Sequence, residues 1–183
     1  MKSALLLIDL QNDYFPGGAW ELVGSDAAAA NAARLLAAFR AAGKPVIHIQ
    51  HVAAHPGATF FLPGTPGVEI HPRVAPAAGE PVVLKHFANS FRDTSLLATL
   101  RALDVDALLV AGMMTHNCVD ATVRAAFDLG LPCRVAGDAC ATRALSYEGE
   151  TVPAAQVQAA FLAALNFFHA QVAPTATLLE AGI

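Results

Sequence analysis

Charged residues are scarce in this chain: Lys, Arg, Asp and Glu make up 14% of its 183 residues, whereas 55% are hydrophobic. Even so, no apolar run reaches the roughly 18 residues that a membrane-spanning helix needs. The N-terminus also lacks the successive basic, apolar and small-residue regions of a secretory signal. We therefore expect a cytoplasmic protein with no membrane partner.

Clusters of Lys and Arg are absent too, and the formal net charge is −4. Nucleic acid and anionic membrane surfaces are bound by basic patches, so neither is an expected partner. With so few charges, apolar groups must cover much of the surface. This composition predicts a homo-oligomer.

The chain has only three cysteines, which show no metal-ligand spacing and cannot all pair. In a cytoplasmic protein this pattern indicates free thiols. Cys133 lies in an apolar run typical of buried packing, and Cys140 follows Asp138 in an expected turn. Cys118 comes where a predicted strand turns into a helix, and the helix dipole and free N–H groups there favour a reactive thiolate.

Short apolar runs alternate with helical patterns along the chain. Strands are predicted at 3–9, 45–51, 81–85, 106–111, 131–136 and, briefly, 171–173. Helices are predicted at 25–42, 94–103, 120–130 and 153–169, with a turn at 137–139 and a long functional loop at 53–81. The alternation predicts an α/β fold, an open and mostly parallel sheet covered on both faces, as a single domain over residues 1–183.

Three chemically different side chains stand at the ends of predicted strands: Asp9, Lys85 and Cys118. Because ligands of open α/β sheets bind beyond the carboxyl ends of the strands, we expect these groups to converge. The carboxylate can take the thiol proton, the ammonium favours the thiolate, and the thiolate can attack a carbonyl carbon. Each residue alone is better explained as a loop cap, a surface lysine or a small buried cysteine. Their combination favours a site.

Two stretches carry a resemblance to a known family: Asp9-Leu-Gln-Asn-Asp-Tyr-Phe15 and Gly112-Met-Met-Thr-His-Asn-Cys-Val119, with Lys85 between them. Together they resemble the isochorismatase-like cysteine hydrolases, which include nicotinamidases, carbamoylsarcosine amidase and ureidoacrylate amidase. The resemblance covers nearly the whole chain. It implies a Rossmann-like, three-layer α/β/α fold with a six-stranded sheet, and often a dimer or tetramer.

The resemblance also implies roles for individual residues. Asp9 corresponds to the general acid and base, Lys85 to its electrostatic partner and Cys118 to the nucleophile. A cis peptide between Met113 and Met114 is implied, with the N–H groups of Met114 and Cys118 forming an oxyanion hole. The predicted activity is hydrolysis of a small-molecule amide, ureide or lactam through a thioester.

A departure from the family pattern argues against a metal. Nicotinamidases are similar in carrying an Asp-x-His metal site after the second strand, but here His51 and Ala53 occupy those two positions. His51 and His55 have helical spacing, yet Pro56 and Gly57 make a helix there unfavourable. We expect no metal, no cofactor and a substrate other than nicotinamide.

Pocket walls are predicted from residues near the strand ends, and core packing is an equally good interpretation of the aromatic ones. These residues are Phe15, Trp20, Phe87, Thr115 and His116, with Phe60 and Phe61 of the long loop closing over them. Tyr147 and Glu148 either reach a neighbouring subunit or are solvated.

Two other functions stay open. A vinyl-ether hydrolase of the isochorismatase type would survive loss of Cys118 but not of Asp9. A non-catalytic binding module or thiol sensor is the alternative outside enzymes.

Overall fold

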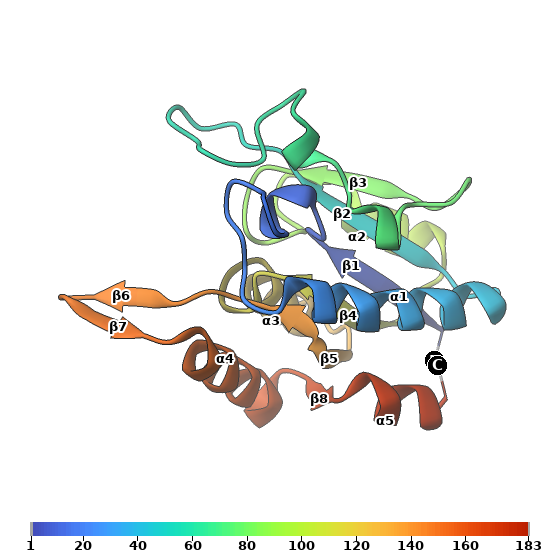
Figure 1. Cartoon of the computed structure of the whole chain (residues 1–183). Coiled ribbons are helices and arrows are strands. Elements are labelled where there is room, and N and C mark those ends of the chain that lie inside the picture. The colour runs from blue at the N-terminus through green and yellow to red at the C-terminus, as the bar shows by residue number, and fades with distance from the viewer. Residues whose placement is uncertain (1, 183) are drawn as a thin grey trace.

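The computed structural model describes residues 2–182, and its centre is a six-stranded sheet (Figure 1). The strand order is β3-β2-β1-β4-β5-β8, and every pairing is parallel. The strands are β1 (Ser3–Ile8), β2 (Val46–His51), β3 (Val82–Lys85), β4 (Ala107–Met113), β5 (Cys133–Ala141) and β8 (Gln171–Ala173). The predicted α/β fold with a sixth short strand is confirmed.

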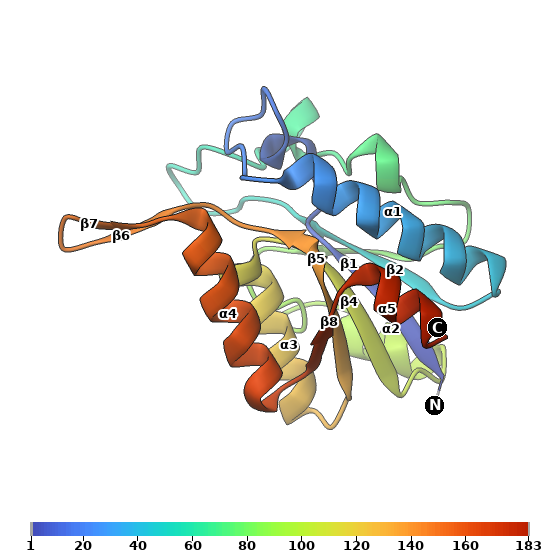
Figure 2. The ribbon, with the colours of Figure 1, turned by 60° about the horizontal axis from the view of Figure 1, so that its bottom comes forward.

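Helices cover both faces of the sheet, which explains why its central strands are apolar throughout (Figure 2). Leu5 and Leu7 of β1 face one core, whereas Leu6 and Ile8 face the other. The first core lies under α1 (Ser25–Ala41) and α5 (Thr175–Glu180); the second lies under α2 (Leu96–Ala102), α3 (Asp120–Asp128) and α4 (Ala154–Phe168).

The predicted turn at 137–139 is wrong, because β5 continues to Ala141. Val110 of β4 pairs with Val135, but Gly112 pairs with Cys140, so residues 136–139 bulge out opposite a single residue. Asp138 in this bulge accepts hydrogen bonds at 2.7 Å from both the backbone N–H and the hydroxyl of Thr175. A partner 37 residues away leaves no signal in the local pattern.

Two segments stand apart from the layers. A hairpin of β6 (Leu145–Tyr147) and β7 (Glu150–Val152), which the sequence pattern missed, projects from the body (Figure 1). The stretch 53–81 is a long loop, as predicted, with single 3-10 turns at Pro66–Val68 and Pro72–Val74. Within residues 2–182, no helix is both long and apolar enough to cross a membrane.

Candidate active site

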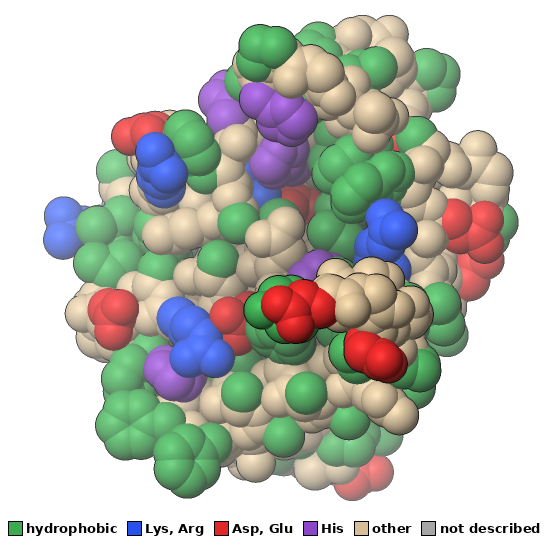
Figure 3. All heavy atoms as spheres, turned by 90° about the vertical axis from the view of Figure 1, so that its left-hand side faces the viewer, with side chains coloured by type: hydrophobic (Ala, Val, Ile, Leu, Met, Phe, Trp, Pro, Cys, Tyr) green, Lys and Arg blue, Asp and Glu red, His purple; other side chains and the backbone are tan. Residues whose placement is uncertain are grey.

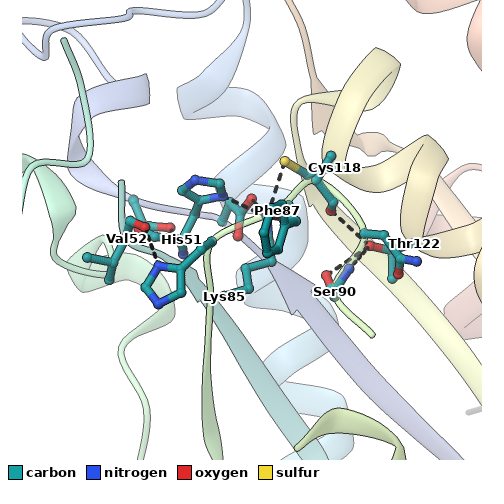
Figure 4. Close-up of polar contacts among 12 residues, drawn as sticks. His51, Val52, Lys85, Phe87, Ser90, Cys118 and Thr122 are labelled. Carbon is teal, nitrogen blue, oxygen red and sulfur yellow. Dashed lines mark hydrogen bonds and ion pairs between the residues drawn. The ribbon is translucent and has the colours of Figure 1, made fainter. Parts of the chain in front are cut away.

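Asp9, Lys85 and Cys118 meet at the carboxyl edge of the sheet (Figure 4). Asp9 follows β1, Lys85 ends β3, and Cys118 lies in a π-helical turn between β4 and α3. The Nζ of Lys85 is 2.7 Å from Oδ2 of Asp9 and 3.2 Å from Sγ of Cys118. The convergence expected from strand ends is therefore present.

The backbone around these residues is unusual. Asp9 has a φ of 51°, in the left-handed region that few residues other than glycine adopt. At Gly112 a side chain is impossible, because a Cβ would lie 2.1 Å from the carbonyl oxygen of Ile8. The cis peptide between Met113 and Met114 that the resemblance implies is confirmed. The segments that carry Asp9 and Cys118 thus pass very close to each other.

Burial controls the electrostatics of the site, since Asp9 and Lys85 are fully buried and Cys118 is 3% exposed. Burial raises the pKa of Asp9 more than Lys85 lowers it. Burial also opposes the charge on Lys85, but Asp9 and Cys118 outweigh it and raise the pKa of that ammonium. The site therefore holds a stable cation beside a carboxyl group that binds a proton more readily than usual.

The thiol differs from the sequence-based expectation of a reactive thiolate. Burial, reinforced by the neighbouring Asp9, raises the pKa of Cys118 to about 12, although Lys85 acts in the opposite direction. The helix dipole does not overcome these effects. Burial thus favours the protonated form of the thiol.

Asp9 faces both the ammonium and the thiol. Its Oδ2 lies 2.7 Å from the Nζ of Lys85. Hydrogen bonds with Lys85 and with Cys118 both lower the pKa of Asp9, against the larger effect of burial. The carboxylate is therefore in position to exchange a proton with the thiol.

The polar residues that follow Asp9 anchor the long loop. Gln11 donates hydrogen bonds to the carbonyls of His51 (2.8 Å) and Val68 (2.7 Å), and it accepts one from the N–H of His51 (2.8 Å). Asp13 accepts from the N–H of Phe61 at 2.6 Å. Gly67 leaves room for this carboxylate, since a Cβ there would lie 2.0 Å from it.

A second anchor joins Lys85's strand to the helix after Cys118. Ser90 donates its N–H to the hydroxyl of Thr122 at 3.0 Å, and the two hydroxyl oxygens lie 2.8 Å apart (Figure 4). All of these atoms are buried. The segment after β3 and the helix α3 are therefore held at a fixed distance.

Two neighbours of the site were missed by sequence reasoning. Tyr14 is buried, and burial together with the charges of Cys118 and Asp9 raises its pKa well above the usual range. His51 lies with its Nδ1 3.0 Å from Nζ of Lys85. The rule that located Lys85 could have located His51, because His51 ends β2 and pairs in register with Lys85.

The residues predicted as pocket walls fall into two groups. Thr115 is fully buried and donates its hydroxyl to the carbonyl of Ala141 at 3.2 Å, and the buried Phe15 stacks on His71 at 3.8 Å. Both side chains already have partners within the protein.

The other predicted wall residues reach the surface. Trp20 stacks on Phe60 at 4.3 Å, and His116 lies 2.5 Å from the Thr142 hydroxyl. Phe87 is 36% exposed, and its carbonyl accepts from Lys85 at 3.1 Å. Figure 3 shows a hollow with histidine side chains at its rim and acidic and basic atoms within it.

One group of side chains has the donor set of a metal site. Ligand atoms of Asp9, His51 and Cys118 lie within 4.8 Å of one another. The Lys85 ammonium contacts all three, at 2.7, 3.0 and 3.2 Å. A divalent ion in that position would need Lys85 to move or to lose its proton, so the protein's own cation fits this group better.

Comparison with known proteins identifies the class to which this arrangement belongs. The Isochorismatase domain model matches residues 3–168, so the chain belongs to the isochorismatase family. It is a hydrolase of that family.

Individual relatives match over most of the chain. The isochorismatase family protein YddQ of Bacillus subtilis (strain 168) is 49% identical over 180 residues, 98% of this chain and 100% of YddQ. The solved structure of an isochorismatase from Pseudomonas putida KT2440 is 40% identical with a TM-score of 0.91, covering 97% of this chain and 90% of that one. Maleamate amidohydrolase of Pseudomonas putida is 36% identical over 135 residues, 66% of this chain and 63% of that enzyme.

Proposed function

We propose that the protein hydrolyses a carbon–nitrogen bond of a small molecule, an amide, ureide or lactam, through a thioester on Cys118. One observation carries the proposal: a single buried ammonium, that of Lys85, contacts both a carboxylate and a thiol. The relationship to an amidohydrolase supports this reaction class.

The first half of the proposed reaction forms the thioester. Oδ1 of Asp9 takes the proton of Cys118 while Sγ attacks the carbonyl carbon, and the C=O electron pair moves onto oxygen. The N–H groups of Met114 and Cys118 stabilise this oxyanion. Because the thiol pKa is about 12, proton transfer accompanies the attack rather than preceding it.

The first half ends when the tetrahedral intermediate collapses: the C–N bond breaks, Asp9 returns its proton to the leaving nitrogen, and the acyl group stays on sulfur as the thioester. The second half releases the acid. Asp9 then takes a proton from water, whose oxygen attacks the thioester carbonyl, and the proton returns to sulfur as the C–S bond breaks. The raised pKa of Asp9 suits both tasks, since acid–base catalysis is most effective near the working pH.

A second candidate, vinyl-ether hydrolysis, rests on the same raised pKa of Asp9, because a protonated carboxyl could protonate a vinyl carbon. The family relative solved as an isochorismatase supports keeping it. A thiol sensor fits less well, since sensing cysteines have a low pKa and are accessible.

Release of ammonia or amine from a panel of small amides, ureides and lactams tests the proposal. Cys118→Ala is expected to reduce kcat/KM by at least about 10³-fold, as loss of a nucleophile does in comparable enzymes. Cys133→Ala is the matched control, because Cys133 is also buried, with its pKa raised to about 12 by burial, but lies on β5 outside the site. Vinyl-ether turnover that survives Cys118→Ala and is lost in Asp9→Asn would favour the second candidate.

A further inference from the structure

His51 is part of the buried site, yet the proposed mechanism gives it no task. Its side chain lies beside Lys85, whose ammonium also contacts Cys118 (Figure 4). Its backbone is held at two points. The Gln11 side chain accepts a hydrogen bond from the N–H of His51 and donates one to the His51 carbonyl, each at 2.8 Å. The position of the imidazole is therefore fixed by the fold.

The contact with Lys85 determines the tautomer of His51. An ammonium only donates hydrogen bonds, so Nδ1 of His51 must accept at 3.0 Å and the ring hydrogen must lie on Nε2. Burial first, and then the charge of Lys85, lowers the pKa of His51 to about 3. The ring thus stays neutral, with a single N–H donor.

That donor is open to the site. Nε2 makes no hydrogen bond to any of the residues 2–182, and it is not among the buried polar atoms that lack a partner. His51 is only partly buried, unlike Asp9 and Lys85. A donor N–H is thus accessible on a ring whose other nitrogen contacts the Lys85 ammonium.

We propose that His51 is a specificity-determining residue: its Nδ1 positions the Lys85 ammonium, and its Nε2–H binds a second oxygen acceptor on the substrate. The substrate class is an amide whose acyl chain carries a carbonyl or carboxylate oxygen a few atoms from the scissile carbonyl. This inference rests on the proposed function for its substrate class.

Distance supports that class. A ring nitrogen of His51 lies within 4.8 Å of Sγ of Cys118, so an acyl group attacked by Sγ extends beside the imidazole. The surroundings are cationic as well, because the Lys85 ammonium lies 3.0 Å from the His51 ring. A bound oxygen with partial or full negative charge is attracted by that ammonium.

Binding to the Cys118→Ala protein tests the inference without turnover. The probes are succinamic acid, succinamide and butanamide, which share a four-carbon amide but differ in the second oxygen. Calorimetry should show the two probes with a second oxygen binding about tenfold more tightly than butanamide, as one additional hydrogen bond to the imidazole N–H provides. Tighter binding of either probe with a second oxygen supports the inference. Comparing succinamic acid with succinamide shows whether the preferred acceptor is a carboxylate or a neutral carbonyl.

Variants then assign the preference to His51. In the Cys118→Ala background His51→Leu should abolish it, whereas His51→Gln should restore part of it because an amide can both accept from Lys85 and donate to the ligand. His55→Gln, at an exposed histidine nearby, should change nothing. A preference that survives His51→Leu would overturn the inference.

A spectroscopic readout needs no variant. Nitrogen-15 NMR of the wild-type protein at pH 7 should show the neutral Nε2–H tautomer of His51, and the Nδ1–H tautomer would overturn the inference. The two proposals fail separately. If the probes with a second oxygen bind preferentially but no amide is turned over, the role of His51 stands and the proposed amidase activity is rejected. If amides are turned over but no probe is preferred, the amidase activity stands and the role of His51 is rejected.

Discussion

Two charge clusters on the same two strands have opposite properties. The active-site cluster comprises Asp9, His51, Lys85 and Cys118. The Glu80 cluster comprises Arg40, His48 and Glu80. His48 and His51 both lie on β2, whereas Glu80 precedes β3 and Lys85 ends it. Each cluster contains a carboxylate, a cation and a histidine.

The difference is whether hydrogen bonding or burial dominates the carboxylate. Glu80 accepts from Arg40 at 2.7 and 2.8 Å, from the N–H of Ala77 at 2.8 Å, and contacts Nε2 of His48 at 2.9 Å. The hydrogen bond from Arg40, above all, lowers the pKa of Glu80 to about 2. Asp9 is fully buried, and burial raises its pKa although Lys85 and Cys118 both lower it. A carboxylate with a lowered pKa stays charged and stabilises the fold, whereas one with a raised pKa can exchange a proton.

The variant with the largest expected effect on stability and activity is Lys85→Met, in the active-site cluster. Removing the ammonium leaves Asp9 buried without a cation, which should cost about 3 kcal/mol of unfolding free energy at pH 8 and abolish activity. The pKa of Asp9 would rise further above its unfolded value, so the loss should grow as pH rises from about 4. Urea unfolding at several pH values measures this effect.

The double variant Asp9→Asn/Lys85→Met provides the control. With both charges gone, stability should return to near the wild-type value while activity stays absent. If the double variant is as unstable as Lys85→Met, the loss comes from packing of the lysine chain rather than from an uncompensated carboxylate.

Glu80→Gln should lower the free energy of unfolding by less than Lys85→Met does, and its activity should not change. It removes a well-bonded carboxylate, so we expect a loss of about 1 kcal/mol at neutral pH and unchanged kcat/KM. Since the folded pKa lies below the unfolded one, the contribution of Glu80 is present above about pH 4.5 and disappears as pH falls toward 2. The difference from wild type should therefore shrink on acidification.

Glu69→Gln is the matched control for this measurement, since Glu69 is an exposed carboxylate on the same long loop. It should change neither stability nor its pH dependence. Reduced turnover in Glu80→Gln would mean that the two clusters are coupled through β2 and β3.

Sequence reasoning located the fold and the meeting of Asp9, Lys85 and Cys118, because apolar runs and strand ends obey general rules of parallel sheets. It did not place His51 beside Lys85, although the same rule applies to the ends of the paired strands β2 and β3. It predicted an activated thiolate at Cys118 from local helix geometry, whereas burial raises the thiol pKa. Burial depends on the assembled fold.

The wrong turn at 137–139 has the same origin. The bulge at 136–139 includes Asp138, which is bonded to the distant Thr175. Contacts between distant residues are not encoded in any local periodicity. The catalytic roles implied by the resemblance and the pocket-wall roles predicted from the strand ends stay predictions.

Asp93→Asn should have the smallest effect on stability, because it removes an exposed charge rather than a buried one. Asp93 is 73% exposed and lies 3.7 Å from Nε of Arg92, so this ion pair has neither burial nor good geometry. We expect a stability change below about 0.5 kcal/mol that is insensitive to salt. Asn is the right replacement because the φ of 55° at this position favours Asn and Asp over other residues. Asp93→Ala should lower the free energy of unfolding by about 1 kcal/mol through the backbone alone. A salt-dependent loss of stability in Asp93→Asn would contradict the prediction, because it would show that this exposed ion pair contributes as the buried ones do.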